Sequence, residues 1–191
     1  MNRIGWNPIQ KVCMSRRGVL QCGAAFAAAA LQFSNALLAA PHARHSRVLS
    51  FYHTHTGESA RIEYWANGQY VFETLPEIDR ILRDHYSDEI QPMDVRLLDL
   101  LHALSIALES SAPIHIISGY RSRATNAMLA ARSSGVARHS LHIDGKAIDL
   151  RIPRHSLARV RSAALALRAG GVGHYPKADF VHLDICRVRS W

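Results

Sequence analysis

The spacing of apolar and polar positions predicts a chain that combines short strands with amphipathic helices. Residues 48–52 and 61–65 are rich in aliphatic and aromatic side chains over lengths typical of strands. Asn67-Gly68 follows, the two-residue signal of a tight hairpin turn, and leads into a third strand at 70–72. We therefore predict an antiparallel meander at the start of the folded domain.

Helical periodicity is clearest between Val95 and Leu108, where apolar residues recur every three or four positions. This pattern predicts a core helix over 92–110, opened by a proline. Other helices are predicted at 75–85, 124–132 and 156–169. Further strands are predicted at 113–118, 147–152 and 181–185, with a rim loop around His174. The fold class that follows is α+β, a small antiparallel sheet with helices packed on one face.

Two of the predicted strands carry polar side chains opposite their apolar residues. Asp149 alternates with apolar neighbours in 147–152, and His182 and Asp184 alternate with apolar neighbours in 181–185. His142 lies seven residues before Asp149, so a turn can carry it back over the strand. Two imidazoles and a carboxylate suit a borderline-soft divalent cation, and three protein ligands plus water are typical of catalytic zinc. These residues predict a metal centre on the polar face of the sheet.

The N-terminal segment has the pattern of an export signal. Arg16-Arg17 forms a twin-arginine box, and an uncharged, alanine-rich stretch runs from there to Ala40. We expect residues 1–40 to be a twin-arginine export signal that is removed, 41–47 a polar linker and 48–191 the functional domain. The alternative is an N-terminal membrane anchor, which the weak hydrophobicity disfavours. Once the export signal is removed, we expect the mature protein to be periplasmic and not to associate with the membrane.

Charge and cysteine content narrow the possible partners and sources of stability. The net charge is +8, and four of the positive charges precede residue 41, where there is no acidic residue, which leaves +4 for 41–191. This excess is spread through helices rather than clustered with aromatic residues, so nucleic acid is a poor partner. Cys186 is the only cysteine in 41–191, so that part can form no intramolecular disulfide. Its stability must come from the core, helped by a metal.

The candidate metal ligands also carry a resemblance to a known family. His142, six intervening residues and Asp149, followed downstream by His182 in Asp-Phe-Val-His, resemble the zinc signature of the M15-type peptidoglycan peptidases. These share a fold with D-Ala-D-Ala carboxypeptidases, D-Ala-D-Ala dipeptidases and the hedgehog signalling domain. The chain is most similar to their exported subfamily, called DUF882 or YcbK-like. That similarity rests on residues 49–58, 118–122, 126, 140–149 and 170–176 and on the C-terminal tryptophan.

The resemblance implies roles for five residues. Zinc would be held by His142, Asp149 and His182, with water completing the coordination. Asp179, three residues before His182, matches the carboxylate that takes a proton from this water. Arg121 matches the arginine that stabilises the developing oxyanion or binds a substrate carboxylate.

Several alternatives stay open at the sequence level. Asp184 competes with Asp179 as the base, although orienting an imidazole is its more ordinary role. His139 could compete as a ligand, and His53 with His55 resembles a chelating pair but suits a polar strand end better.

The expected function is hydrolysis of peptide cross-links in peptidoglycan by a zinc metallo-endopeptidase. A D,D- or L,D-carboxypeptidase or dipeptidase that trims stem peptides is the nearest alternative. A zinc-stabilised binding module without turnover is a third possibility, of another class. The residues do not indicate which cross-link is cleaved or what the oligomeric state is.

Overall fold

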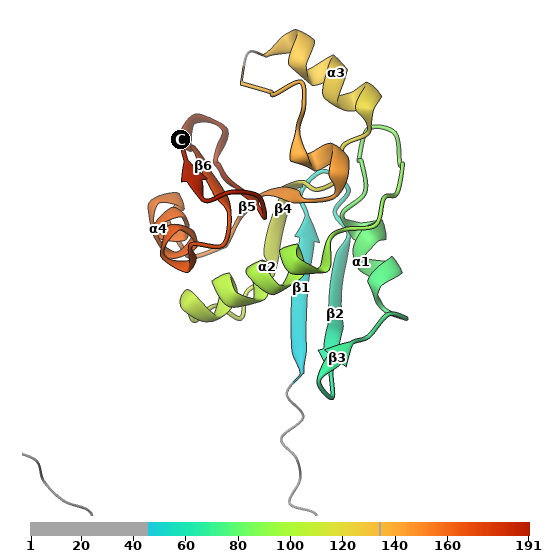
Figure 1. Cartoon of the computed structure of the whole chain (residues 1–191), viewed down its shortest axis with the longest axis vertical. Helices are drawn as coiled ribbons and strands as arrows, with labels where there is room; N and C mark the ends of the chain where they lie inside the picture. The colour runs from blue at the N-terminus through green and yellow to red at the C-terminus, as the bar shows by residue number, and fades with distance from the viewer. Residues whose placement is uncertain (1–45, 134) are drawn as a thin grey trace, which may run out of the picture. The chain divides into compact units, whose positions relative to one another are not determined.

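The computed structural model describes residues 46–133 and 135–191 of the chain (Figure 1). The predicted export signal at 1–40 and residues 41–45 of the predicted linker lie outside the described residues. Strand β1 begins at Arg47, the last residue that we assigned to the linker. The structure therefore bears on the predicted domain at 48–191 and not on the segments before it.

The described residues form four α-helices and eight strands, with two short 3₁₀ turns. The strands are β1 (Arg47–His53), β2 (Ser59–Ala66), β3 (Gln69–Tyr70), β4 (Ile114–Ser118), β5 (Ala147–Arg151), β6 (Gly171–Tyr175), β7 (Phe180–Asp184) and β8 (Arg189–Ser190). The helices are α1 (Leu75–Ile81), α2 (Val95–Ala107), α3 (Arg123–Arg132) and α4 (Leu157–Leu167). The 3₁₀ turns are η1 (Leu141–Asp144) and η2 (Pro176–Ala178).

Helices α1, α2 and α4 are shorter than predicted, and polar side chains explain the start of α2 and the end of α1. Helix α2 begins after Asp94, whose carboxylate accepts a hydrogen bond from the Arg96 backbone N–H at 3.0 Å and so caps the helix. Helix α1 ends at Ile81 rather than at residue 85. The buried Asp84 carboxylate accepts hydrogen bonds from the backbone N–H groups of Tyr86 and Ser122, which holds the chain in a turn there.

Within the described residues the strands form one mixed sheet in the order β3-β2-β1-β4-β5-β7-β6-β8. The prediction of a small antiparallel sheet was wrong in part, because β1 pairs parallel with β4 and β6 pairs parallel with β8. Strands β2 and β3 and helices α1 and α2 separate β1 from β4 in the chain, and β4 then runs alongside Phe51 to His53 of β1 in the same direction. The predicted meander of β1, β2 and β3 is present. The predicted rim loop around His174 is instead strand β6.

The hydrophobic core lies between the sheet and three helices. Helix α2 contacts β1 and α4, helix α4 contacts β6 and β7, and α1 contacts β2 (Figure 1). Every second residue of the central strands points into this core, including Phe51, Ile116, Ile148 and Leu150. Each fully buried aliphatic side chain of this size stabilises the fold by roughly 1.5–3 kcal/mol. The helices therefore cover one face of the sheet and leave the other for the polar residues.

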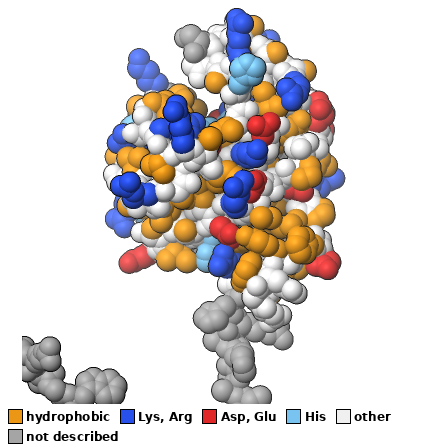
Figure 2. Space-filling view, viewed as in Figure 1, with side chains coloured by type: hydrophobic (Ala, Val, Ile, Leu, Met, Phe, Trp, Pro, Cys, Tyr) orange, Lys and Arg blue, Asp and Glu red, His pale blue; other side chains and the backbone are white. Residues whose placement is uncertain are grey.

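The surface of the domain shows no single charged patch on the face in Figure 2. Lys and Arg side chains are scattered there among apolar and acidic ones. Across 46–133 and 135–191, no helix combines the length and apolarity that a membrane crossing requires.

Candidate metal centre

Four residues from neighbouring strands form a row across one face of the sheet. Ser118 of β4 lies opposite Asp149 of β5. Asp149 also lies opposite His182 of β7, which in turn lies opposite Gly173 of β6. Directly opposed residues share a face, so Asp149 and His182 point to the same side. The neighbours of Asp149 along β5 point into the core, so this row lies on the polar face.

His142 reaches the row from the η1 turn. The Ser140 hydroxyl accepts a hydrogen bond from the His142 backbone N–H at 3.4 Å and caps this turn. Gly145 ends it at φ 65°, and a Cβ there would lie 2.5 Å from the carbonyl oxygen of Pro92. The eight residues from His142 to Asp149 therefore comprise most of one 3₁₀ turn, a chain reversal that needs glycine, and the start of β5.

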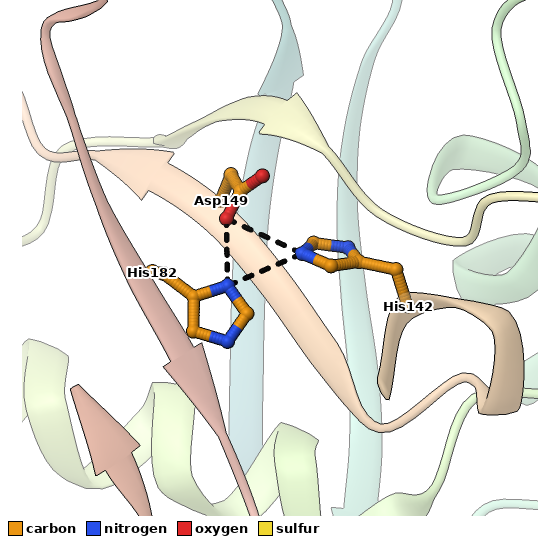
Figure 3. A group of neighbouring side chains, drawn as sticks. All are labelled: His142, Asp149 and His182. Atoms are coloured by element: carbon orange, nitrogen blue, oxygen red, sulfur yellow. Dashed lines mark hydrogen bonds and ion pairs between the residues drawn. The ribbon is translucent and has the colours of Figure 1, made fainter. Parts of the chain in front are cut away.

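Three donor atoms of these residues face one another (Figure 3). Asp149 Oδ1 lies 2.8 Å from His182 Nδ1 and 3.3 Å from His142 Nε2. The two ring nitrogens, His142 Nε2 and His182 Nδ1, are 3.2 Å apart. Donors bound to one tetrahedral zinc at about 2.0–2.1 Å lie about 3.3 Å apart. The triangle therefore fits a single zinc-sized cation with an imidazole, imidazole and carboxylate donor set.

Each histidine has its other ring nitrogen occupied by a protein acceptor. His142 Nδ1 lies 2.6 Å from the carbonyl oxygen of Gly119, to which it donates as an N–H. His182 Nε2 lies 3.2 Å from Asp184 Oδ2 and donates to it in the same way. These partners leave the lone pairs of His142 Nε2 and His182 Nδ1 free to bind a cation, an arrangement typical of metal-binding histidines.

Asp184 is fully buried and receives hydrogen bonds from several sides. Besides His182, the Gly171 and Cys186 backbone N–H groups and the Arg189 guanidinium donate to it. Burial raises the pKa of the Asp184 carboxyl, but these hydrogen bonds outweigh burial and hold the pKa well below its ordinary range. Such a carboxylate is suited to holding the His182 ring and poorly suited to accepting a proton.

The electrostatics of the three donors favour cation binding. Burial raises the pKa of Asp149, but the two histidines outweigh it and hold this carboxyl far below its ordinary value. Burial lowers the pKa of His142, so this ring is neutral at neutral pH. Burial also lowers the pKa of His182, but Asp149 and Asp184 raise it by more. An incoming cation therefore meets an ionised carboxylate, and protons compete with it more at His182 than at His142.

Arg121 holds the remaining oxygen of Asp149. Its Nη2 lies 3.0 Å from Asp149 Oδ2, which leaves Oδ1 for the donor triangle. Only 8% of Arg121 is exposed, and its Nε has no hydrogen-bond partner among the described residues. Burial lowers the pKa of this guanidinium, and the charge of Asp149 offsets part of the effect. The structure thus brings Arg121 to the predicted metal ligands, where its guanidinium uses one of five N–H donors in a hydrogen bond within the described residues.

Asp179, the predicted base, does not lie in the cavity with the other candidate site residues. Its carboxylate is 62% exposed and forms an ion pair with Arg151. Its backbone lies in the left-handed region at φ 57°, at the end of η2. Asp179 does not line the cavity that holds the three donors, whereas its neighbours Ala178 and Phe180 do. A role at the metal centre requires this carboxylate to leave Arg151.

The three donors lie in a cavity of about 460 Å³. Its walls come from distant parts of the chain, namely the turn after β1, the loops after α1 and α3, strand β6 and the C-terminal residues. The side chains that line it include Arg121, Ser118, His55, His85, Tyr86, His139, Tyr175, Phe180, Arg189 and Trp191. The cavity therefore leaves space beside the donor triangle.

Tyr175, His85 and Trp191 were not singled out as site residues from the sequence. The rings of His55 and His85 stack at a centroid distance of 4.2 Å, and Trp191 lies 5.4 Å from His182. A prediction of strand β6 would have placed Tyr175 beside the metal centre. His53 is buried, and its Nδ1 accepts from the His55 backbone N–H at 3.2 Å, so this ring supports the turn after β1.

A His, Asp and His donor set in an open cavity, on a sheet backed by helices, is the arrangement of a metal-dependent hydrolase. The chain belongs to the M15 peptidases, in the family described as peptidoglycan L,D-endopeptidase MepK, whose model matches residues 41–191. M15 peptidases are generally metal-dependent, in keeping with the donor set.

Individual relatives extend over most of the chain. Peptidoglycan L,D-endopeptidase MepK of Escherichia coli strain K12 is 42% identical over 145 residues, which cover 76% of this chain and 80% of the relative. The probable peptidoglycan L,D-endopeptidase MepK of Haemophilus influenzae is 39% identical over 158 residues, 82% of this chain and 85% of the relative. No solved structure matches the chain.

Proposed function

We propose that this protein is a zinc-dependent endopeptidase that hydrolyses peptide cross-links of peptidoglycan. The observation that carries the proposal is the triangle of His142, Asp149 and His182 donors, each held by a protein partner, in an open cavity. The names of the relatives supply the substrate class and favour an endopeptidase over a carboxypeptidase or dipeptidase. The unpaired Arg121 Nε favours an enzyme over a binding module, because a structural metal site needs no such donor.

Each residue of the proposed site has a distinct task. When bound, zinc would polarise the scissile carbonyl and lower the pKa of a water molecule to about 7. Gly119 and Asp184 fix the two imidazole rings, and Arg121 fixes the carboxylate of Asp149. The Arg121 guanidinium, which lines the cavity, can donate a further hydrogen bond to a substrate oxygen as negative charge develops on it.

We keep Asp179 as the proposed general base, which moves the proton from water to the leaving amine. Its ion pair with Arg151 is exposed, and such pairs contribute only about 0–1 kcal/mol, so breaking the pair costs little. Asp184, the competing carboxylate, has its oxygens occupied by four donors.

The proposal extends to location and fold. Residues 1–40 would direct export by the twin-arginine route, and cleavage would release residues 41–191 into the periplasm. The mixed sheet with its metal centre opposite the helices would share the fold of the D-Ala-D-Ala peptidases and the hedgehog domain.

Digestion of purified sacculi tests the proposed metal dependence. After muramidase digestion, we expect sacculi treated with the zinc-loaded protein to yield more un-cross-linked muropeptides, and chelator treatment to abolish this increase until zinc is added back. The His142→Ala variant should be inactive under all three conditions, and Tyr52→Phe, a substitution on β1 outside the cavity, serves as the control. Full activity after chelation, or in His142→Ala, would refute a metal-dependent hydrolase.

A further inference from the structure

The Tyr175 side chain lies on the same face of the sheet as the metal centre. Gly173 of β6 is directly opposite His182, and Tyr175 is directly opposite Phe180. Residues two apart on a strand share a face, so Tyr175 points to the side of His182. The rings of Tyr175 and Phe180 stack at a centroid distance of 4.6 Å, and both line the cavity. The phenol therefore forms a wall of the space in which a substrate would lie.

The hydrogen bond between Tyr175 and Trp191 has only one possible direction. Trp191 Nε1 lies 2.7 Å from the Tyr175 hydroxyl oxygen. An indole nitrogen can only donate, so the Tyr175 oxygen is the acceptor and its own proton points elsewhere. Among residues 46–133 and 135–191 the hydroxyl has no other hydrogen-bond partner. Tyr175 thus presents an unused O–H donor in the cavity.

The indole that orients Tyr175 is itself held in place. The backbone of Trp191 is hydrogen bonded to Val172 and His174 of β6, and the Arg189 guanidinium lies 4.8 Å from the indole centroid. A Cβ on Gly173 would lie 2.8 Å from Trp191 Cε2, so the indole occupies space that only glycine leaves open. In this position the indole ring is close to the His182 ring, and its N–H is hydrogen bonded to the Tyr175 hydroxyl.

Arg121 lines the same cavity as the phenol. Its guanidinium donates one hydrogen bond, to Asp149, and its Nε has no partner among the described residues. The Ser118 hydroxyl of β4 lines this cavity as well and is likewise without a partner there. The Tyr175 O–H is therefore one of several unused donors that share a cavity with the donor triangle.

We propose that Tyr175 is a catalytic residue whose O–H donates a hydrogen bond to the scissile carbonyl oxygen as it becomes an oxyanion, with Trp191 as its positioning residue. The proton stays on the phenol, so no bond is made or broken at Tyr175. This inference rests on the proposed peptidase function and adds to it a second side-chain donor besides Arg121.

Kinetics of Tyr175→Phe on a purified cross-linked muropeptide dimer test the catalytic role. Loss of one oxyanion donor typically lowers kcat by about a hundredfold or more, and KM should change little because the bond forms chiefly in the transition state. Trp191→Phe should lower kcat by less, since the phenol remains but loses its orienting N–H. Combining the two substitutions should cost no more than Tyr175→Phe alone, because Trp191 acts through Tyr175.

Two further measurements separate catalysis from structure. Zinc content and thermal unfolding should match those of the wild type in Tyr175→Phe and in the control Tyr52→Phe. A phosphinate analogue of the cross-linked dipeptide, which mimics the tetrahedral oxyanion, should bind Tyr175→Phe at least about tenfold more weakly in calorimetry.

The outcomes distinguish this inference from the function on which it rests. An inactive wild type would contradict the peptidase function itself. An active wild type with unchanged kcat and phosphinate affinity in Tyr175→Phe would overturn the role of Tyr175 alone. Additive losses in the double variant would overturn the positioning role of Trp191.

Discussion

The two histidines of the candidate metal centre are distinguished by which ring nitrogen each presents to the donor triangle. His142 offers Nε2 because its Nδ1–H is bound to the Gly119 carbonyl, and His182 offers Nδ1 because its Nε2–H is bound to Asp184. The difference follows from where the rings originate, one on a 3₁₀ turn and one on a strand. Strand alternation predicted which side chains share a face, but the partners that fix the rings depend on contacts between distant segments.

Substitution of Asp184 should weaken metal binding. In Asp184→Asn the group that holds the His182 ring is no longer charged. Its amide N–H₂ is a donor and meets groups that also donate, namely the Gly171 and Cys186 backbone N–H groups and the Arg189 guanidinium. Loss of such a partner typically lowers metal affinity about 10–100-fold. Competition with a chromogenic zinc chelator measures this affinity directly.

Asp179→Asn is the matched comparison, because it also neutralises an aspartate but lies outside the cavity. We expect its zinc affinity to equal that of the wild type and its kcat to fall by about 10²–10⁴, as for a lost general base. Wild-type turnover in Asp179→Asn would contradict its assignment as the base. Wild-type zinc affinity in Asp184→Asn would contradict the orienting role of Asp184.

At the level of elements, strand β6 supplies or contacts several residues of the candidate site, but its sequence did not predict a strand. The run Gly170-Gly171-Val172-Gly173 reads as the end of a helix followed by a loop. In the structure the glycines instead allow close approach. A Cβ on Gly170 would lie 1.7 Å from the Asp184 carbonyl oxygen, and one on Gly173 would meet the Trp191 indole. In the sequence alone, a glycine required for close approach of two segments looks the same as a glycine required for a turn. Only the position of the neighbouring strand distinguishes the two cases.

Gly173→Ala should disturb the packing of Trp191. The added methyl would lie 2.8 Å from the Trp191 and Tyr175 rings, so one of them must move. Overpacking of this kind typically costs about 1–3 kcal/mol in the free energy of unfolding, measurable by denaturant titration.

The Trp191→Ala background provides the control for this clash. Without the indole much of the crowding is gone, so Gly173→Ala should cost clearly less there than in the wild type. Equal costs in the two backgrounds would show that the indole does not occupy the space above Gly173.

For the molecule as a whole, local patterns predicted the elements better than their arrangement. The 3.6-residue period of Val95 to Leu108 predicted α2, and alternation around Asp149 predicted β5 with its polar face. The parallel pairing of β1 with β4 depends on where the chain returns after α2, which alternation cannot reveal. The cavity likewise combines residues from His55 to Trp191, and only the folded sheet brings them together.

The clustering of His142, Asp149 and His182 was predictable because strand alternation and a family signature agree on these residues. The exposed ion pair of Asp179 with Arg151 was not predictable, since Asp179 was assigned its role by the family resemblance, which says nothing of its contacts.

The most direct test of the central claim is mass analysis of the products formed from a purified cross-linked muropeptide dimer. We predict that the zinc-loaded protein converts the dimer into two monomeric stem peptides and that the metal-free protein leaves it intact. Release of a terminal amino acid from a dimer that stays cross-linked, or the same two monomers without metal, would contradict a metal-dependent endopeptidase.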